Sequence, residues 1–283
     1  SLCSKIGKAC YIPVGHKSPK CLKKDAVIKK LKKILEDPSI KKIGQNIKFD
    51  FIVFYKNGIT LSSMEDTMLM SYVLDAGKNR HNMDTLSEIH LGHKTISFKD
   101  MVGTGKKEIN FSEVELDKAK DYAAEDADVT FRLYKKFIKN LKSEKMINIY
   151  EIFEKPLIKI LAFMEIEGVE IDSKFLKSLS SKFEKKIQKL EKEVFKISKR
   201  EFNIASPKQL GEIIYNDLKI AGLKKTKKGS FATSASVLED LAFKGHEFPK
   251  LILDWRQVSK LKNTYTDALP EHLNPNTKRV HTS

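Results

Sequence analysis

An acidic cluster on one helical segment most constrains how this chain can fold. Residues 122–130, YAAEDADVT, hold three carboxylates within four positions, yet they lie inside a long segment with apolar residues at helical spacing. Positions i and i+4 of a helix share a face, so Tyr122 and Asp126 point the same way, whereas Asp128 points elsewhere. A charged carboxylate at the edge of a core is unfavourable unless it is paired or binds a cation. The segment therefore predicts a helix over residues 117–141 that carries a candidate metal ligand.

An acid in the first turn of a helix is also stabilised by the helix dipole, and this alternative needs no metal. It suits Asp121 and Glu125 better than Asp126. A second candidate acid, Asp50, follows a short strand and a GQN turn in IGQNIKFDF and lies in the first residues of a helix. A capping or dipole role is common for such an aspartate, so Asp50 by itself does not define a metal site.

Hydrophobic periodicity divides the chain into two regions. Up to about residue 143, short apolar runs alternate with helical patterns, which is typical of an α/β domain, and beyond it the patterns are mainly helical. With 283 residues, of which 41% are hydrophobic, the chain can form two cores. We therefore expect an α/β domain over residues 1–143 and an all-α region over residues 144–283. The expected helices span residues 25–35, 48–55, 66–74 with Asp66 as N-cap, 83–91, 117–141, 176–197, a segment opening at Pro207 with Ser206 as N-cap, and 248–269, and a lysine-rich loop covers residues 224–230.

The charge of the chain indicates a polyanionic partner. The net charge is +16, and clustered basic residues gain free energy by releasing counterions from a phosphate backbone. Only five of the 53 basic residues are arginines, so the alternative is that lysine simply fills solvated faces. No apolar run approaches the length of a transmembrane helix, so no membrane partner is expected. Three cysteines without metal-ligand spacing, Cys3, Cys10 and Cys21, are typical of a reduced, cytoplasmic setting.

Other local patterns are less specific. GTGKK (103–107) lacks the spacing of a phosphate-binding loop, and His90 and His93 have no matching pair of ligands for zinc. The amphipathic segment 176–197 has the spacing of a short coiled coil, which would make the protein a dimer. Because its apolar stripe covers only about three heptads, we expect an intramolecular helix and a monomer.

A known family contains similar stretches in the same order. The proofreading 3′–5′ exonuclease domain of the bacterial DNA polymerase I family, the family A DNA polymerases, has motifs that resemble IGQNIKFD (43–50), EDTMLMSYVLDAGKNRHNMDTL (65–86), HKTISF (93–98) and YAAEDADVT (122–130). The start of the polymerase domain in that family, including its thumb, resembles KPLIKILAFMEIEGVEID (155–172), EFNIASPKQL (201–210) and KLKNTYTDALPEHLNPNTKRVHTS (260–283). Together these stretches extend over nearly the whole chain.

The resemblance implies a ribonuclease-H-like α/β exonuclease fold for the first domain and a thumb for the second. In the family, four acids and a tyrosine hold two divalent ions against the scissile phosphate, so Mg²⁺ or Mn²⁺ is the implied cofactor. By motif match, Asp50 and Asp126 are catalytic metal ligands and Tyr122 orients the attacking water. Phe98 would stack on a frayed base. The positions that match the surroundings of the bound single-stranded 3′ end are Asn46, Arg80, Met83 and Phe98.

In the second domain, the resemblance implies contacts to the backbone or minor groove of a primer-template DNA duplex. The matching residues are Asn203, Ser206, Lys208, Arg256, Lys260, Asn263 and Thr264. Such contacts position DNA and read little sequence, and for each residue a solvated helix face is the alternative. The resemblance thus implies a DNA-directed DNA polymerase with a proofreading exonuclease, which acts in DNA replication and repair in the cytoplasm, at the nucleoid.

The chain departs from the family pattern in one respect. The first motif of the family, an Asp-x-Glu at the end of a strand, supplies two metal ligands, and no Asp-x-Glu occurs in these 283 residues. We expect this motif upstream of ACYIPVG and the polymerase acids after Ser283, so the chain alone is expected to be inactive. One alternative is a stand-alone exoribonuclease of the same superfamily, which leaves FNIASPKQL (202–210) unexplained. The other is a non-catalytic DNA-binding module, against which the joint presence of Asp50, Tyr122 and Asp126 argues.

Overall fold

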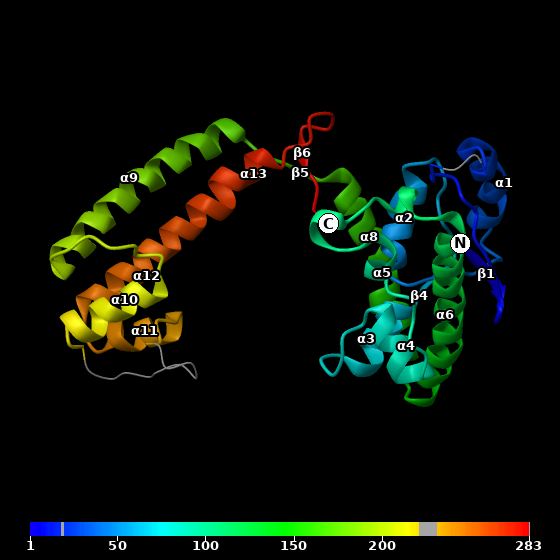
Figure 1. Ribbon diagram of the computed structural model, residues 1–283, viewed down its shortest axis with the longest axis horizontal. Helices are drawn as coiled ribbons and strands as arrows, with labels where there is room; N and C mark the ends of the chain where they lie inside the picture. Colours follow the sequence, from blue (N-terminus) through cyan, green and yellow to red (C-terminus); the bar gives the residue numbers. More distant parts are fainter. Residues whose placement is uncertain (18–19, 221–230, 283) are drawn as a thin grey trace. The chain divides into compact units, whose positions relative to one another are not determined.

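The computed structural model describes residues 1–17, 20–220 and 231–282. The chain forms two compact units, Ser1–Ile166 and Glu167–Ser283, and Figure 1 traces the chain through both. The expected order, an α/β region followed by an α-helical region, is confirmed. The predicted lysine-rich loop at residues 224–230 lies outside the described residues. Among the described residues, no helix is long and apolar enough to cross a membrane.

The first unit contains two short strand pairs. β1 (Leu2–Lys5) and β2 (Lys8–Cys10) form an antiparallel hairpin, and β3 (Lys42–Gly44) runs parallel to β4 (Met64–Asp66). The parallel register places Gly44, the first residue of the GQN turn, opposite Asp66. All three residues of β4 are buried, although two of them are acids. The turn that precedes Asp50 is thus fixed against a buried strand.

Helices surround these strands, and the five that the sequence predicts in this unit are confirmed to within two residues at each end. The helices and helical turns of this unit are α1 (Lys24–Glu36), α2 (Ile47–Tyr55), α3 (Thr67–Asp75), α4 (Met83–Leu91), α5 (Phe98–Val102), η1 (Gly105–Lys107), η2 (Phe111–Glu113), α6 (Leu116–Ser143), α7 (Ile147–Ile149), η3 (Tyr150–Glu154) and α8 (Lys155–Glu167). Asp66 caps α3 as predicted, because its side chain accepts hydrogen bonds from Met68 N–H and Leu69 N–H.

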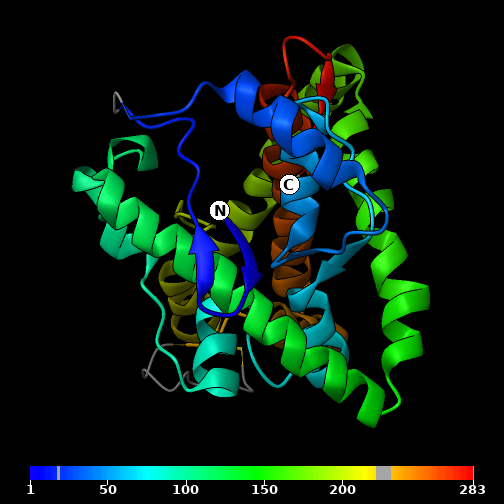
Figure 2. The ribbon, with the colours of Figure 1, turned by 90° about the vertical axis from the view of Figure 1, so that its right-hand side faces the viewer.

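α6 is the helix of the first unit against which several other elements pack. Its apolar face is buried through Val129, Leu133, Phe137 and Leu141, and α3 and α4 pack against it. The β1–β2 hairpin lies across another side of the same helix (Figure 2). The acidic stretch therefore belongs to a helix that packs against several other elements of the unit.

The first compact unit extends beyond residue 143. Tyr150, Ile158 and Ala162 are buried in clusters that also contain residues of α2, α3 and α6, so the segment after α6 belongs to this core. Lys48 of α2 forms an ion pair with Glu165 of α8. Helical periodicity reveals that such a segment is helical but not which core it joins. The assignment of separate functions to residues 1–143 and 144–283 stays a prediction.

The second unit is helical apart from one short antiparallel strand pair among its described residues. Its elements are β5 (Val169–Glu170), α9 (Ser173–Ser198), α10 (Pro207–Glu212), η4 (Ile213–Asp217), α11 (Ala235–Phe243), α12 (Glu247–Lys260), η5 (Leu261–Asp267), α13 (Ala268–Glu271) and β6 (Arg279–Val280). Ser206 caps α10 as predicted, since its side chain accepts the Gln209 N–H. The predicted helix over residues 248–269 is realised as α12, η5 and α13 in succession.

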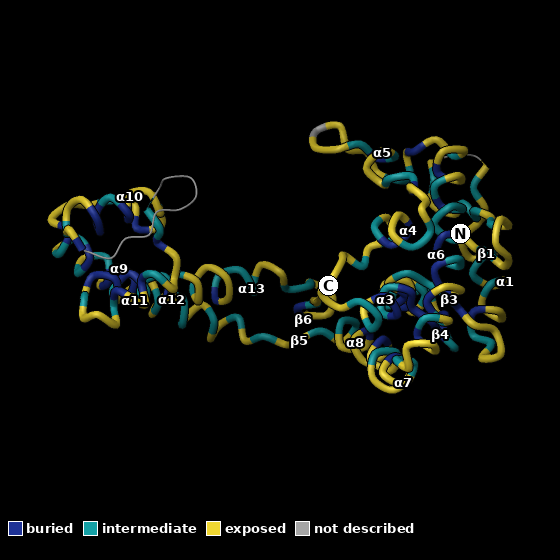
Figure 3. The backbone as a smooth tube through the Cα atoms, turned by 90° about the horizontal axis from the view of Figure 1, so that it is seen from below, coloured by how far each residue is buried: buried dark blue, intermediate teal, exposed yellow. Residues whose placement is uncertain are grey.

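The core of the second unit lies where the end of α9 meets α10, α11 and α12. Figure 3 shows the buried backbone concentrated there. Its buried side chains include Val194, Ile204, Leu210, Ile214, Leu238 and Ile252. Further along, Ile187 and Leu190 of α9 pack against Val258 of α12. Much of the apolar stripe of α9 therefore has its partner within the same unit.

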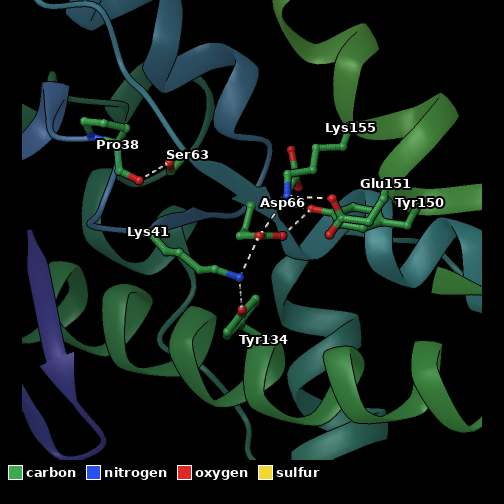
Figure 4. A network of polar contacts seen from close by, with 9 residues as sticks. Pro38, Lys41, Ser63, Asp66, Tyr134, Tyr150, Glu151 and Lys155 are labelled. Atoms are coloured by element: carbon green, nitrogen blue, oxygen red, sulfur yellow. Dashed lines mark hydrogen bonds and ion pairs between the residues drawn. The ribbon is translucent and has the colours of Figure 1, made fainter. Parts of the chain in front are cut away.

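A buried ion-pair network joins β4 to the helices around it. Glu65, which is 1% exposed, accepts hydrogen bonds from Lys155 Nζ (2.9 Å), Lys41 Nζ (3.2 Å) and the Tyr150 hydroxyl (3.1 Å). In Figure 4, Lys41 approaches from one side and Tyr150 and Lys155 from the other. Burial lowers the pKa of Lys155, but hydrogen bonds and charges of Glu65 and Glu151 outweigh it, so the pKa is raised overall. The network fixes the start of α8 to the central strand.

Glu65→Gln is expected to lower the free energy of unfolding of the first unit by about 2 kcal/mol, because Lys155 then keeps a partly buried charge without its buried counterion. Glu151→Gln removes a more exposed carboxylate from the same lysine and should lower it by less than about 0.5 kcal/mol. Urea denaturation followed by circular dichroism measures both.

The effect of Glu65→Gln should depend on pH in one direction. Because the pKa of Lys155 is raised in the folded state, the stabilisation from the Glu65–Lys155 pair is fully present below about pH 10.4, where 10.4 is the ordinary lysine pKa. It is lost as the pH rises further. Equal losses for Glu65→Gln and Glu151→Gln at pH 7 would contradict the role given to the buried pair.

Candidate functional site

The carboxylates of YAAEDADVT have three different environments, and the first belongs to Glu125. This carboxylate contacts His93 Nε2 (2.7 Å) and accepts the Ile96 N–H (2.6 Å). α6 begins at Leu116, so Glu125 is beyond the first turn and the helix-dipole alternative does not apply to it. Glu125 instead ties the segment before Phe98 to α6.

Asp128 occupies the second environment, on a different side of α6. Its carboxylate accepts the Gly7 N–H (2.6 Å) and pairs with Arg132 (2.7 Å). This contact attaches the turn of the β1–β2 hairpin to the helix. The prediction that Asp128 points away from the Tyr122 side of the helix is consistent with these partners.

Asp126 occupies the third environment, with few partners of its own. The Tyr122 hydroxyl donates a hydrogen bond to its carboxylate, while Asp126 Oδ1 is buried and has no hydrogen-bond partner. Burial raises the pKa of Asp126 to about 6; the bond from Tyr122 opposes this rise, and the charges of Glu125 and Asp84 add to it. A buried oxygen that the protein leaves unsatisfied is a position where a cation would be stabilised.

Asp50 lies in the first turn of α2, as predicted. The residue has surface open to solvent, yet the surrounding protein raises the pKa of its carboxylate to about 6, first by burial and second by the charge of Asp66. The raised pKa means that the charged form of this carboxylate is unfavourable without a counter-ion, and a nearby cation would stabilise it.

Asp50 and Asp126 both lie close enough to the backbone nitrogen of Ser1, at the start of the β1–β2 hairpin, for a charge at that position to act on each carboxylate. The two predicted acids, carried by different helices, therefore lie within electrostatic reach of the same point.

The donor set suits a hard divalent cation but is incomplete. Carboxylate oxygens are the ligands that Mg²⁺ and Mn²⁺ prefer. In the ranges that the structure describes, however, no group of three or more His, Cys, Asp or Glu residues is arranged to hold a metal ion. The unpartnered Asp126 Oδ1 and the Asp50 carboxylate would supply part of such a donor set.

A further acid near the site, Asp84, is missed by the sequence analysis. Asp84 lies in the first turn of α4, where it accepts the Thr95 hydroxyl (2.7 Å). Its charge contributes to the raised pKa of both Tyr122 and Asp126. The sequence offers a weak signal for it, an aspartate one residue after Met83 in the stretch NMDTL, which reads as an ordinary first-turn acid.

Aromatic rings form a continuous wall beside Tyr122. The Phe98 ring, 48% exposed, lies 6.0 Å from the Tyr122 ring and 5.9 Å from the Phe111 ring, with which it stacks. Phe111 is 5.8 Å from Tyr122 and also contacts His16. The structure thus brings Phe98 and Tyr122 together, and it adds Phe111, which the sequence analysis does not select.

The other predicted contacts to a 3′ end lie around the GQN turn. Asn46 is exposed and precedes α2, and Gln45 Nε2 donates to the His81 carbonyl (2.8 Å), which brings this turn next to the segment before α4. Arg80 is exposed in that segment. Met83 is different, because it packs partly buried against the core of α6 rather than standing free on the surface.

In the second unit, four predicted DNA contacts line one groove. Arg256, Lys260, Asn263 and Thr264 surround a groove of about 650 Å³ together with Trp255 and residues of the α10 start. Arg256 donates to the Thr233 carbonyl (2.7 Å), and burial lowers the pKa of its guanidinium group. The groove thus combines two cations with polar side chains along α12 and η5.

The remaining predicted contacts have local structural roles as well. Asn203 Oδ1 accepts the Ala205 N–H (3.0 Å), and Ser206 is the cap of α10. Lys208 is exposed on the first turn of α10. The alternative of an ordinary turn or capping residue therefore remains for Asn203 and Ser206.

The sequence matches two family models. Residues 1–142 match the 3′-5′ exonuclease family, and residues 173–283 match DNA polymerase family A. With the carboxylates and aromatic wall of the first unit, these matches define the class of protein: a 3′–5′ exonuclease domain followed by part of a family A DNA polymerase domain.

Curated relatives identify the family more narrowly. DNA polymerase I of Rhizobium leguminosarum is 46% identical over 288 residues, which cover 98% of this chain. DNA polymerase I of Pseudomonas aeruginosa is 42% identical over 291 residues and covers all of it. The chain belongs to the DNA polymerase I family, as the motifs had indicated. It spans 28% and 32% of the lengths of these two relatives.

A solved structure supports the fold. The POL domain of Pol1 from M. smegmatis, in complex with DNA primer-template and dNTP, superposes with a TM-score of 0.74 at 24% sequence identity. The match covers 94% of this chain and 43% of that one. At this identity, the likeness shows the fold alone.

Asp126→Asn is expected to stabilise the first unit at pH 7. Because the pKa of Asp126 is raised to about 6, the folded state binds the proton more tightly than the unfolded chain, so stability falls as pH rises from about 4 to about 6. Because the amide cannot ionise, the free energy of unfolding of the variant should be about 1 kcal/mol higher than that of the wild type at pH 7. This difference is smaller than the full pKa shift implies, because solvent screens a partly exposed group.

Thermal unfolding at pH 4 and pH 7 checks this expectation. The advantage of Asp126→Asn should be much smaller at pH 4, where the folded wild type is protonated at Asp126 and about half of the unfolded chains are as well. Asp121→Asn, on the exposed side of the same helix, serves as the control and should change little at either pH. An Asp126→Asn protein that is less stable than the wild type at pH 7 would contradict the inference that the charged form of Asp126 is unfavourable in the folded state.

Proposed function

We propose that this chain supplies most of the proofreading 3′–5′ exonuclease domain and the thumb region of a DNA polymerase I, which extends primers and removes mispaired 3′ ends during DNA replication and repair. The observation that carries the proposal is the Tyr122–Asp126 pair, in which one buried carboxylate oxygen of Asp126 is left without a hydrogen-bond partner. Such a protein would work as a monomer in the cytoplasm, at the nucleoid.

Asp50 and Asp126 would hold a divalent cation, Mg²⁺ or Mn²⁺, through their carboxylate oxygens. When bound, such an ion lowers the pKa of a water ligand and neutralises charge on a phosphate. Tyr122 donates its hydroxyl hydrogen to Asp126, which fixes the carboxylate and holds the ring against Phe98. An unpaired 3′ base would stack on the exposed Phe98 ring.

The acids of this chain make a partial site. Two-metal phosphodiester hydrolysis needs more carboxylates than Asp50 and Asp126, and the 283 residues contain no Asp-x-Glu. The further ligands are therefore expected from outside this stretch. Polymerisation likewise is a function of the longer protein and not of these residues alone.

The groove of the second unit would hold the backbone of a primer-template duplex. Lys260 and Arg256 supply positive charge for phosphates, and Asn263 and Thr264 supply polar groups beside them. The solved structure that resembles this chain contains DNA primer-template and dNTP, which supports DNA as the partner. Contacts of this kind hold the duplex without selecting its sequence.

Two alternatives are less well supported. A stand-alone exoribonuclease accounts for the acids of the first unit but not for the groove of the second or for the match of residues 173–283 to DNA polymerase family A. A non-catalytic DNA-binding module leaves the unsatisfied oxygen of Asp126 without a purpose.

The longer protein that contains this chain is expected to release mononucleotides from single-stranded DNA 3′ ends when Mg²⁺ or Mn²⁺ is present. Asp50→Asn or Asp126→Asn should reduce the rate by about 100-fold or more, since each removes charge from the metal site. The 283-residue chain alone should release none, because its ligand set is incomplete. Product analysis on denaturing gels measures the rates, with EDTA as a blank.

Asp75→Asn, at the far end of α3, is the matched control and should cleave like the wild type. Full activity in the Asp126→Asn protein would overturn the assignment. Faster degradation of an RNA 3′ end than of a DNA 3′ end would favour the exoribonuclease.

Lys260→Ala is expected to weaken binding of a primer-template duplex and to reduce the slope of log K against log salt by about 0.9, the value for one lost phosphate contact. Lys250→Ala removes an exposed lysine from the same helix outside the groove and should leave the slope unchanged. Fluorescence anisotropy over a range of KCl concentrations measures both. Equal effects would mean that the groove has no special role.

A further inference from the structure

Asp66 holds the starts of two helices with a single carboxylate. Its Oδ1 accepts the N–H groups of Met68 (2.8 Å) and Leu69 (3.4 Å) in the first turn of α3, and also that of Asn46 (3.1 Å). Its Oδ2 accepts the N–H of Ile47 (2.9 Å), the first residue of α2. Asp66 is 1% exposed, so these four backbone groups take the place of solvent around the carboxylate.

The capping of α2 comes from across the fold and not from its own N-cap residue. Asn46 occupies the N-cap position and is of a type that often caps helices, but its side chain makes no capping bond. Its backbone is left-handed, at φ 59°, which is uncommon outside glycine and tolerated by asparagine. Asp66 performs the capping instead, and the exposed Asn46 keeps its amide for another partner.

A carboxylate satisfies this position more fully than its amide would. The positive ends of two helix dipoles meet at Asp66, which favours a negative charge there. Both oxygens must accept hydrogen bonds, whereas an asparagine would present one acceptor and one NH₂ group. Burial raises the pKa of Asp66, and its four N–H donors oppose that change.

We propose that Asp66 is a positioning residue of the exonuclease site, an inference that rests on the proposed function. Its carboxylate fixes the first turn of α2, and with it Asn46 and Asp50, against the start of α3. Asp50 lies three residues after Ile47 in that turn. Because a misplacement of about 1 Å can change a rate on the order of 100-fold, the clamp sets how well Asp50 can act.

The Asp66→Asn variant separates the two halves of the clamp. The amide oxygen is expected to keep the three bonds that Oδ1 accepts, so the NH₂ group will face the Ile47 N–H, which loses its acceptor. Hydrogen exchange by NMR on the 283-residue chain should show the Ile47 amide exchanging about tenfold faster or more, while the Met68 amide changes little. The resonances of Asn46 to Asp50 should shift as the turn moves.

Activity gives an independent measurement in the longer protein that contains this chain. Asp66→Asn should lower the single-turnover cleavage rate by about tenfold or more and change the Kd for single-stranded DNA by a clearly smaller factor, because it displaces Asp50 but only one of the predicted 3′-end contacts, Asn46. Asp75→Asn, the same change at the other end of α3, should alter neither the exchange nor the rate.

The outcomes separate this inference from the proposed function. A wild-type protein without metal-dependent cleavage would refute the proposed function, and the amide exchange would still decide whether Asp66 holds α2. An unchanged Ile47 amide would overturn the clamp even in an active enzyme. Uniformly faster exchange across α2, α3 and α6 would mean that Asp66 merely stabilises the unit, which also overturns the positioning role.

Discussion

A carboxylate inside a protein is tolerated where cations or several N–H groups surround it, and the first unit is arranged around this requirement. Glu65 meets it with two lysines and a tyrosine, and Asp66 meets it with four backbone N–H groups. Both acids belong to β4, a strand that is buried throughout. Because Glu65 contacts the start of α8 and Asp66 contacts the starts of α2 and α3, these two residues fix the positions of three helices.

The same requirement distinguishes the acids that support the fold from those that are available for chemistry. Asp126 has a single donor, the Tyr122 hydroxyl, and one oxygen without a partner. The pKa of the Asp50 carboxyl group is raised, although the residue as a whole is exposed. The charges of Asp50 and Asp126 are unfavourable for the stability of the unit. Glu65 and Asp66 of β4, which have full sets of hydrogen-bond donors, hold the neighbouring helices in place.

Helices and their caps were predictable from the sequence because their signals are local. Apolar spacing located α4 and α6, and Asp66 and Ser206 were identified as caps from residue type alone. β4 is not predictable in this way, since MED contains two charged residues and only one apolar residue, Met64. The chain segment around Tyr150 was assigned to the second region, because helical spacing does not reveal which core a helix joins.

The site residues that belong to a sequence motif were predictable. Residues that take part in the site only through tertiary contacts were not. Asp50, Tyr122 and Asp126 follow from the motifs. Asp84 and Phe111 do not, because each becomes part of the site only when a distant segment packs beside it. Likewise, the second function of Asp66 depends on the β3–β4 register, which brings the GQN turn opposite it.

The wall of rings beside Asp126 has a consequence for selectivity. Phe98 and Phe111 present carbon faces, and the hydroxyl of Tyr122 is already engaged with Asp126, so this surface offers purines and pyrimidines no pattern of donors and acceptors to distinguish them. Every base has a flat face that can lie on such a ring. An enzyme with this surface would not distinguish between the bases that it removes, and a proofreading enzyme has to remove any misincorporated nucleotide.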